Sequence, residues 1–415
     1  MIWPVLPLAD VAEVRLGRQR APKNHTGDSM RPYLRAANVT WNGLSLCDVK
    51  SMNFTDHELG TYRLEPGDLL LSEASGSAGE VGKPALWTGE IEDCAFQNTL
   101  IRVRPRQHEP KFLLHYFRWQ ALAGRFVEHS RGVGIHHLGR ARLASWPTPV
   151  PPLDVQRRIV DLLEDHLSRL DAAEAGLGTS LTGTEAMLTS GLWHATHGLD
   201  AAEKAELQCV AEVRLGRQRS PKNHTGDRMR PYLRAANVGW DELRLDDVKE
   251  MQFTETEELT YRLEPGDIIL TEASGSPAEV GKSAVYRGEP SEVCFQNTLL
   301  RLRCHSADPE FVQKYLLAEA RAGRFMPESG GVGINHLGRT RLAALQIEVP
   351  TPAQQATAIN ACRELVDEIS RLQSAIRAQT RRSDALHRSL LAAAFSGRLT
   401  GSASDLSVAE EMIGA

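Results

Sequence analysis

The residues of this 415-residue chain best suited to chemistry are a group of cations in the segment RLGRQRAPKNHTGDSMRPYLRAANV, at 15–39. Six lysine and arginine residues occur within 21 positions, opposed there by Asp28. Lysine and arginine neutralise phosphates, and arginine, glutamine and asparagine can pair with the donors and acceptors on base edges. The segment predicts nucleic-acid recognition; a solvated basic loop is the alternative.

This basic segment occurs twice. It returns 199 residues later, at 214–238, with changes from Ala21 to Ser220 and from Ser29 to Arg228. The second change is where the two copies of the segment differ clearly in charge. The recurrence favours ligand binding modestly, because duplication also preserves a solvated loop.

The repeat extends far beyond the basic segment. A shift of 199 positions aligns residues 11–151 with 210–350 without a gap, and 87 of these 141 pairs are identical. Solenoid repeats are about 20–50 residues long, so a repeat of this length indicates a duplicated domain. The chain is also too long for one ordinary core and is expected to form at least two domains.

Two other parts of each copy are candidate DNA contacts. In RGVGIHHLGR (131–140), glycines let the backbone approach a phosphate, and histidine and arginine can donate to it. A buried, hydrogen-bonded His137 is the alternative there, and Gln97–Asn98 is a weaker candidate that could simply bond the backbone. The predicted DNA-binding residues are Arg15, Arg18, Gln19, Arg20, Lys23, Asn24, His25, Arg31, Arg35, Asn38, Gln97, Asn98, Arg131, His137 and Arg140, and in the second copy Arg214, Arg217, Gln218, Arg219, Lys222, Asn223, His224, Arg228, Arg230, Arg234, Asn237, Gln296, Asn297, His336 and Arg339.

Sequence patterns of catalysis and metal binding do not occur. The six cysteines include no CxxC pair, so no zinc site is expected. ASGSAGEVGK (74–83) resembles a phosphate-binding loop, but Ser77 stands where that motif requires its first glycine. The chain lacks GxGxxG, HExxH, GxSxG and the N/D-P-P-Y/F methyltransferase motif. We expect no catalytic residue, metal or cofactor on this chain.

The composition predicts a soluble protein of a bacterial or archaeal cytoplasm. The net charge of −5 excludes a chain that is basic throughout but allows a local basic face. Scattered cysteines fit a reducing compartment. There is no basic region followed by an apolar run at the start, and no apolar stretch of about 18 residues.

The elements that must position these residues are mostly short strands. YRLEPGDLLLSEASGS (62–77) predicts a turn, a buried strand and a loop, and FQNTLIRVRP (96–105) predicts a strand. Residues 109–126 have helical spacing. Each copy is therefore predicted to be a strand-rich α/β domain with a late helix.

A long helix is predicted after each copy. The second begins after Thr351 with Pro352 as its first residue, and its apolar residues step by 4, 3 and 4. The first is weaker and is expected to break near Gly176–Gly183. We expect the helices to pair with each other rather than pack separately on their own domains. The predicted interface residues are Leu163, Leu170, Leu177, Leu365, Ile369, Leu372 and Ile376.

The predicted fold class is mixed α/β, with two similar strand-rich domains separated by two long helices that pair in a coiled coil. The predicted domains are 1–152 and 201–351, the helical regions are 153–200 and 352–400, and the tail is 401–415.

Taken in order, several segments resemble the specificity subunit of Type I restriction–modification systems. They are YLRAANV, EPGDLLLSEASGSAGEVG, FQNTLIRVRP, RGVGIHHLGR, PTPVPPLDVQRRIVDLL and the final AFSGRLT. The resemblance covers nearly the whole chain and recurs in both halves. No single motif is diagnostic, but their order, found twice with a helix after each, is specific.

The resemblance implies a non-catalytic subunit with two recognition domains, each reading one half of an interrupted DNA site. It implies that the two domains are target recognition domains related by a pseudo-twofold axis and that the two helices pair as an antiparallel coiled coil. The helix pair would set the gap between the halves and dock two methyltransferase subunits, which bring S-adenosylmethionine. Restriction subunits driven by ATP with Mg²⁺ would join them. Family recognition domains commonly diverge, whereas these two are about 60% identical, so we expect half-sites that form a near-inverted repeat.

Three other functions stay open from the sequence. A recognition subunit of another anti-phage or modification-only system is the main alternative. A self-sufficient nuclease or methyltransferase would need an active site that the sequence does not show. A scaffold that does not bind DNA is the third.

Overall fold

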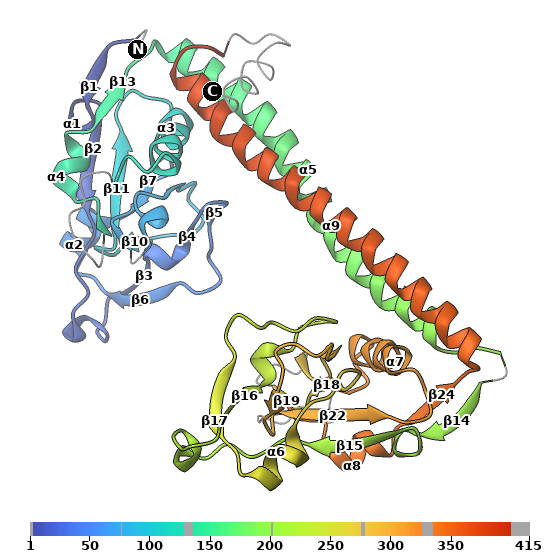
Figure 1. Cartoon of the computed structure of the whole chain (residues 1–415). Helices are drawn as coiled ribbons and strands as arrows, with labels where there is room; N and C mark the ends of the chain where they lie inside the picture. Colours follow the sequence, from blue (N-terminus) through green and yellow to red (C-terminus); the bar gives the residue numbers. More distant parts are fainter. Residues whose placement is uncertain are drawn as a thin grey trace. The chain divides into compact units, whose positions relative to one another are not determined.

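The computed structural model of the chain describes residues 3–75, 77–127, 136–200, 202–274, 279–325 and 335–399 (Figure 1). It forms two compact units: unit 1 contains Met1–Leu177 and Ala378–Ala415, and unit 2 contains Gly178–Arg377. Each unit holds one copy of the repeat, called head 1 or head 2, and part of each long helix. The predicted tail, 401–415, and Arg131 lie outside the described residues. The boundaries between heads and helices stay a prediction.

Head 1 contains a four-stranded antiparallel sheet of order β2–β11–β7–β9 and a three-stranded sheet of order β10–β3–β6, in which β10 and β3 are parallel. Smaller pairs are β1–β13, β4–β5 and β8–β12. The strands are β1 (Val5–Pro7), β2 (Ala12–Leu16), β3 (Met30–Leu34), β4 (Val39–Thr40), β5 (Gly43–Leu44), β6 (Lys50–Asn53), β7 (Leu69–Ser72), β8 (Ala74–Ser75), β9 (Pro84–Leu86), β10 (Ala95–Phe96), β11 (Leu100–Pro105), β12 (His136–His137) and β13 (Pro147–Pro149). The helices are α1 (Leu8–Val11), α2 (Asp56–Tyr62), α3 (Pro110–Leu122) and α4 (Arg140–Ala144).

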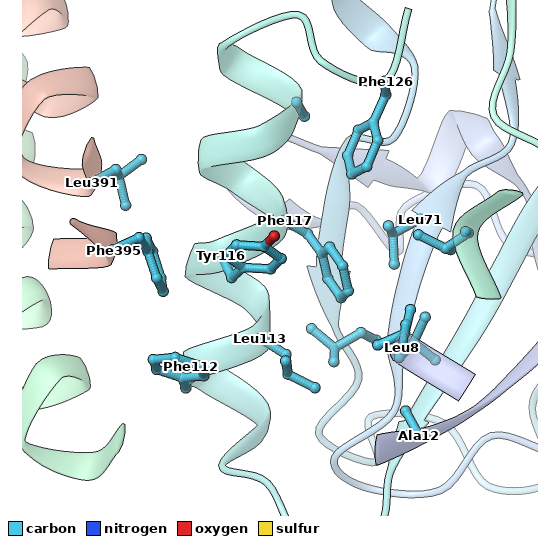
Figure 2. Close-up of a cluster of buried hydrophobic side chains, with 14 of the residues drawn as sticks. Leu8, Ala12, Leu71, Phe112, Leu113, Tyr116, Phe117, Phe126, Leu391 and Phe395 are labelled. Atoms are coloured by element: carbon cyan, nitrogen blue, oxygen red, sulfur yellow. The ribbon is translucent and has the colours of Figure 1, made fainter. Parts of the chain in front are cut away.

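The apolar run in β7 is continuous because this strand is buried on both faces. Successive side chains of a strand point to opposite sides. Leu71 packs in the cluster with Phe117 of α3 (Figure 2), whereas Leu70 packs with Phe96 in a second cluster. The buried strand and late helix expected in each copy are thus present.

Head 2 repeats this arrangement with sheets of order β15–β22–β18–β20 and β17–β16–β21, and with the pairs β14–β24 and β19–β23. Its strands are β14 (Glu203–Glu206), β15 (Ala211–Leu215), β16 (Met229–Leu233), β17 (Lys249–Gln252), β18 (Ile268–Thr271), β19 (Ala273–Ser274), β20 (Ser283–Val285), β21 (Cys294–Phe295), β22 (Leu299–Cys304), β23 (Asn335–His336) and β24 (Gln346–Val349). Its helices are α6 (Glu255–Tyr261), α7 (Pro309–Arg321) and α8 (Arg339–Ala343).

The two long helices, α5 (Leu153–Thr196) and α9 (Pro352–Phe395), pair antiparallel. In unit 1, Leu163 near the start of α5 shares a core cluster with Leu391 near the end of α9. In unit 2, Leu192 near the end of α5 shares a cluster with Cys362 and Ile369 from the first half of α9. The expected helix pair is therefore present, and α9 begins at Pro352 as predicted.

The break expected near Gly176–Gly183 is wrong, because α5 is helical throughout Leu153–Thr196. A glycine costs about 1 kcal/mol in a helix interior, but packing of the flanking turns outweighs this cost. Among the predicted interface residues, Leu163 and Ile369 are buried, and Leu170, Leu177, Leu365 and Ile376 are partly buried. Leu372 is 42% exposed and does not lie in the seam.

The heads differ strongly in the helix that faces the helix pair. α3 and α7 share four of 13 residues, whereas residues 11–40 share 27 of 30 with their counterparts. In unit 1, Phe395 of α9 stacks on Trp119 with ring centroids 5.6 Å apart. In unit 2, the residue that follows α5, His197, stacks on Tyr315 at 3.9 Å and contacts Glu319 at 3.0 Å. Each head is therefore matched to its own helix end.

Burial of His115 on α3 predicts acid sensitivity of unit 1. Burial, and then the charge of Arg118, lowers the pKa of His115 from 6.5 to about 3. Because the pKa of His115 is depressed in the folded state, protonation of this residue favours the unfolded chain. The free energy of unfolding is therefore at its full value above pH 6.5 and falls as the pH decreases toward 3. At pH 4.5 the loss is about 3 kcal/mol. His387 and Lys111 also lower this pKa, and the carboxylate of Glu164 lies 4.0 Å from the ring.

Denaturant unfolding at pH 7.0 and pH 4.5 checks this expectation. The variant His115→Leu should lose less unfolding free energy between the two pH values than the parent, by about 3 kcal/mol. Equal losses in the two proteins would mean that His115 does not carry the effect.

Candidate nucleic-acid interface

The basic segment of head 1 leaves the sheet at the end of β2 and returns at the start of β3. Its first turn is held against the backbone before β11. Gly17 donates to the Leu100 carbonyl at 3.1 Å, and Asn98 donates its backbone N–H to the Arg18 carbonyl at 3.0 Å. A Cβ on Gly17 would lie 2.2 Å from the Gln97 carbonyl oxygen, so glycine is required there. The backbone of Gln97–Asn98 thus anchors the loop, as it does for Gln296–Asn297 in head 2.

Arg18 anchors the loop through its side chain. Its guanidinium lies 2.7 Å from Glu58 and 4.7 Å from the centre of the Phe54 ring, and its side chain is 11% exposed. The same arrangement recurs in head 2, where Arg217 lies 2.8 Å from Glu257. These arginines are already satisfied within the protein.

Arg35 and Asn38 also have partners in head 1. Arg35 forms an ion pair with Asp48. Asn38 is buried and accepts a hydrogen bond from the Arg35 N–H at 3.1 Å while it donates to the Ser45 carbonyl at 2.9 Å. Arg234 and Asn237 repeat these contacts in head 2.

The tip of the segment is the exposed part. Gln19, Arg20, Lys23 and His25 are all exposed, and Arg20 donates to His25 at 3.0 Å. Neither Arg20 nor Lys23 has an ion pair within the described residues. The exposed residues Gln218, Arg219, Lys222 and His224 occupy the same positions in head 2. We call these two groups of four the loop tips.

The remaining candidates of the segment are half-buried or paired. Arg15 lies 2.7 Å from Glu13, and Arg31 lies 4.0 Å from Asp93. Asn24 is partly buried. In head 2 Arg214 pairs with Glu212, Asn223 accepts hydrogen bonds from Arg217, and Arg228 and Arg230 both pair with Glu258.

The second candidate surface lies beside β8 and β12. His137 is 59% exposed rather than buried, and its ring lies 3.2 Å from Glu73. His336 and Glu272 form the same pair at 2.9 Å in head 2. Arg140 and Arg339 are exposed, at the first residues of α4 and α8.

The comparisons with known proteins agree with this geometry. The family model described as "Type I restriction modification DNA specificity domain" matches residues 2–181. The StySPI specificity subunit of Salmonella potsdam and the EcoKI specificity subunit of Escherichia coli, both of Type I restriction enzymes, are each 23% identical over 96% of this chain and 89% of their own. Residues 2–181 thus match this DNA specificity domain, and the chain as a whole is similar to specificity subunits of Type I restriction enzymes.

Solved structures share the fold of this chain. A chain from a structure on complex assembly and conformational transition of the type I R-M system has a TM-score of 0.74 and 18% identity, with 96% of this chain and 98% of that chain covered. The HsdS subunit from Thermoanaerobacter tengcongensis has a TM-score of 0.53 and 18% identity, with 96% and 97% covered.

Sequence reasoning missed the carboxylates that hold the arginines of the two basic segments. Glu58 was visible as part of the capping box TDHE, in which Thr55 and Glu58 cap α2 reciprocally. Its ion pair with Arg18, 40 residues away, left no local signal. Within the described residues, no cluster of histidine, cysteine, aspartate or glutamate could hold a metal, and no helix there is long and apolar enough to cross a membrane.

Proposed function

We propose that this chain is the DNA-recognition subunit of a Type I restriction–modification complex and that it catalyses no reaction itself. The observation that carries the proposal is the pair of identical loop tips. Each presents glutamine, arginine, lysine and histidine to solvent from a backbone fixed by the same contacts. Exposed cations that form no ion pair within the described residues are available to phosphates, and glutamine and arginine are available to base edges.

Salt dependence of DNA binding tests this function. The apparent affinity of the purified chain for a DNA duplex should fall steeply and linearly on a logarithmic scale as the salt concentration rises, with a slope of about −0.9 for each phosphate neutralised. Affinity that does not depend on salt would favour a scaffold that does not bind DNA.

The two heads should read nearly the same bases. All four residues of the loop tip are identical in the two heads, so their hydrogen-bonding groups are identical. In each unit a head sits on the start of the helix that follows it and on the end of the other helix, which supports the inverted relation of two half-sites. The target is then a near-inverted repeat around an unread spacer.

Sequencing of DNA methylation in a host that expresses this chain with its methyltransferase checks the inverted repeat. The methylated motif should have two halves that are reverse complements, apart from about one base. Two unrelated half-sites would contradict the proposal.

The proposal extends to the partners. The helix pair formed by α5 and α9 would bind two methyltransferase subunits, and restriction subunits would join them in the bacterial or archaeal cytoplasm. S-adenosylmethionine, ATP and Mg²⁺ would then be bound by those partners. The proposal about partners is supported by the similarity of this chain to Type I specificity subunits and by the pairing of α5 with α9.

A further inference from the structure

Head 2 contains a buried carboxylate where head 1 contains a leucine. Under the shift of 199 residues, Glu258 corresponds to Leu59. Leu59 packs in an apolar cluster with Met52 and Phe54. The Glu258 side chain is only 9% exposed. A charge so little exposed is costly unless cations surround it.

Three arginines surround Glu258. Its carboxylate lies 3.0 Å from Arg228, 3.1 Å from Arg230 and 3.2 Å from Arg262. Hydrogen bonds from Arg230, and also from Arg228, lower the pKa of Glu258, so the group is charged at neutral pH. Arg228 is the extra arginine of the second basic segment, because head 1 has Ser29 there.

The changes from Ser29 to Arg228 and from Leu59 to Glu258 therefore lie in one cluster and cancel in charge. In head 1, Asp93 lies 4.0 Å from Arg31 and 3.5 Å from Arg63, which gives two cations and one anion. In head 2 there are three cations and two anions, since Glu292 also contacts Arg262 at 2.8 Å. Each cluster carries a net charge of +1.

We propose that Glu258 takes the place of a DNA phosphate for Arg228 and Arg230 and withholds from DNA the extra arginine of head 2. A carboxylate and a phosphate compete for the same guanidinium donors. The inference rests on the proposed DNA-binding function. It explains how two basic segments that differ in one arginine present the same charge, as the reading of similar half-sites requires.

DNA binding by full-length variants tests this inference. Glu258→Gln should bind a DNA duplex several-fold more tightly than the parent, with a salt slope steeper by about 1 to 2 because one or two arginines become free. Arg228→Ser should leave the affinity unchanged, because that arginine is already neutralised. The double variant Arg228→Ser, Glu258→Leu recreates the residues of head 1 and should also bind like the parent.

Two results with these variants would overturn the inference. The first is a Glu258→Gln variant with unchanged affinity and unchanged salt slope. The second is a loss of affinity in Arg228→Ser, which would make Arg228 a direct DNA contact. Glu242→Gln is the matched control, since it removes a carboxylate that pairs with Arg244 on the same head at 3.1 Å. An equal gain in the Glu242→Gln variant would mean that net charge, not position, sets the affinity.

Folding of the variants is checked by thermal unfolding. If Glu258→Gln unfolds, Arg228→Ser and the double variant still decide, because the double variant contains no unpaired buried charge at position 258. Failure of the proposed function is recognised separately. It would appear in the parent as affinity that does not change with salt, and this inference would then fall with it.

Discussion

Replacement of Arg20, Lys23, Arg219 and Lys222 by alanine is expected to reduce DNA affinity on the order of 100-fold at 0.1 M salt and to reduce the salt slope by about 1 for each cation removed. These four side chains are exposed and have no ion pair within the described residues. Within the described residues their removal breaks one hydrogen bond, from Arg20 to His25, and no ion pair, so the melting temperature should stay within about 1 °C. Fluorescence anisotropy over a salt series measures the effect.

The control for the loop tips removes cations from elsewhere. Arg377 and Arg381 are exposed on α9, and neither has an ion pair within the described residues. The variant Arg377→Ala, Arg381→Ala should change the slope far less than Arg20→Ala, Lys23→Ala does. Equal changes would show that the overall charge of the chain, not the loop tips, attracts DNA.

Arg18 separates anchoring from DNA contact within the same segment. Arg18→Ala should lower the stability of head 1 by about 2–4 kcal/mol, because Glu58 then loses the guanidinium 2.7 Å from it. DNA affinity per folded molecule should change less than in the loop-tip variants. The opposite pattern would make Arg18 a DNA contact.

The sequence predicted the duplication, the buried strands, the late helix of each head and the helix pair, because each leaves a local or periodic signal. It did not separate anchoring arginines from free ones. Arg18, Arg20 and Arg35 look alike in sequence, but the carboxylates that engage two of them are 40 and 13 residues away. Ion pairs between distant residues follow from the fold and have no period.

The comparison of the heads adds information that one head alone could not give. The segment that carries the loop tip hardly differs between the heads, whereas α3 and α7 differ at nine of 13 positions. The changed positions include Trp119 and the counterpart of Gln120, Glu319, which contact different helix ends in the two units. At α3 and α7 the heads therefore diverge where they contact different helix ends, whereas the loop tips proposed to read the same bases are identical.

Ile369→Asp is expected to destabilise unit 2 by about 4 kcal/mol or more, whereas Leu372→Asp should cost less than about 1 kcal/mol. Ile369 is 2% exposed and packs in the cluster with Leu188, Leu192 and Cys362. Leu372, one turn further along α9, is 42% exposed. Both variants place the same carboxylate on the same helix, so the difference isolates burial. Denaturant unfolding measures both costs.

The same pair of variants asks whether the helix pair supports the complex. Ile369→Asp separates α5 from α9 in unit 2, so binding of the methyltransferase should weaken together with stability. Ile369→Asn tests the role of charge, since it retains most of the cavity and polarity but carries no charge. Its cost should be smaller than that of Ile369→Asp. If Leu372→Asp proves as costly as Ile369→Asp, the seam between the helices lies on a different face of α9. If Ile369→Asp unfolds unit 2 but methyltransferase binding is unchanged, the docking site lies outside that part of the helix pair.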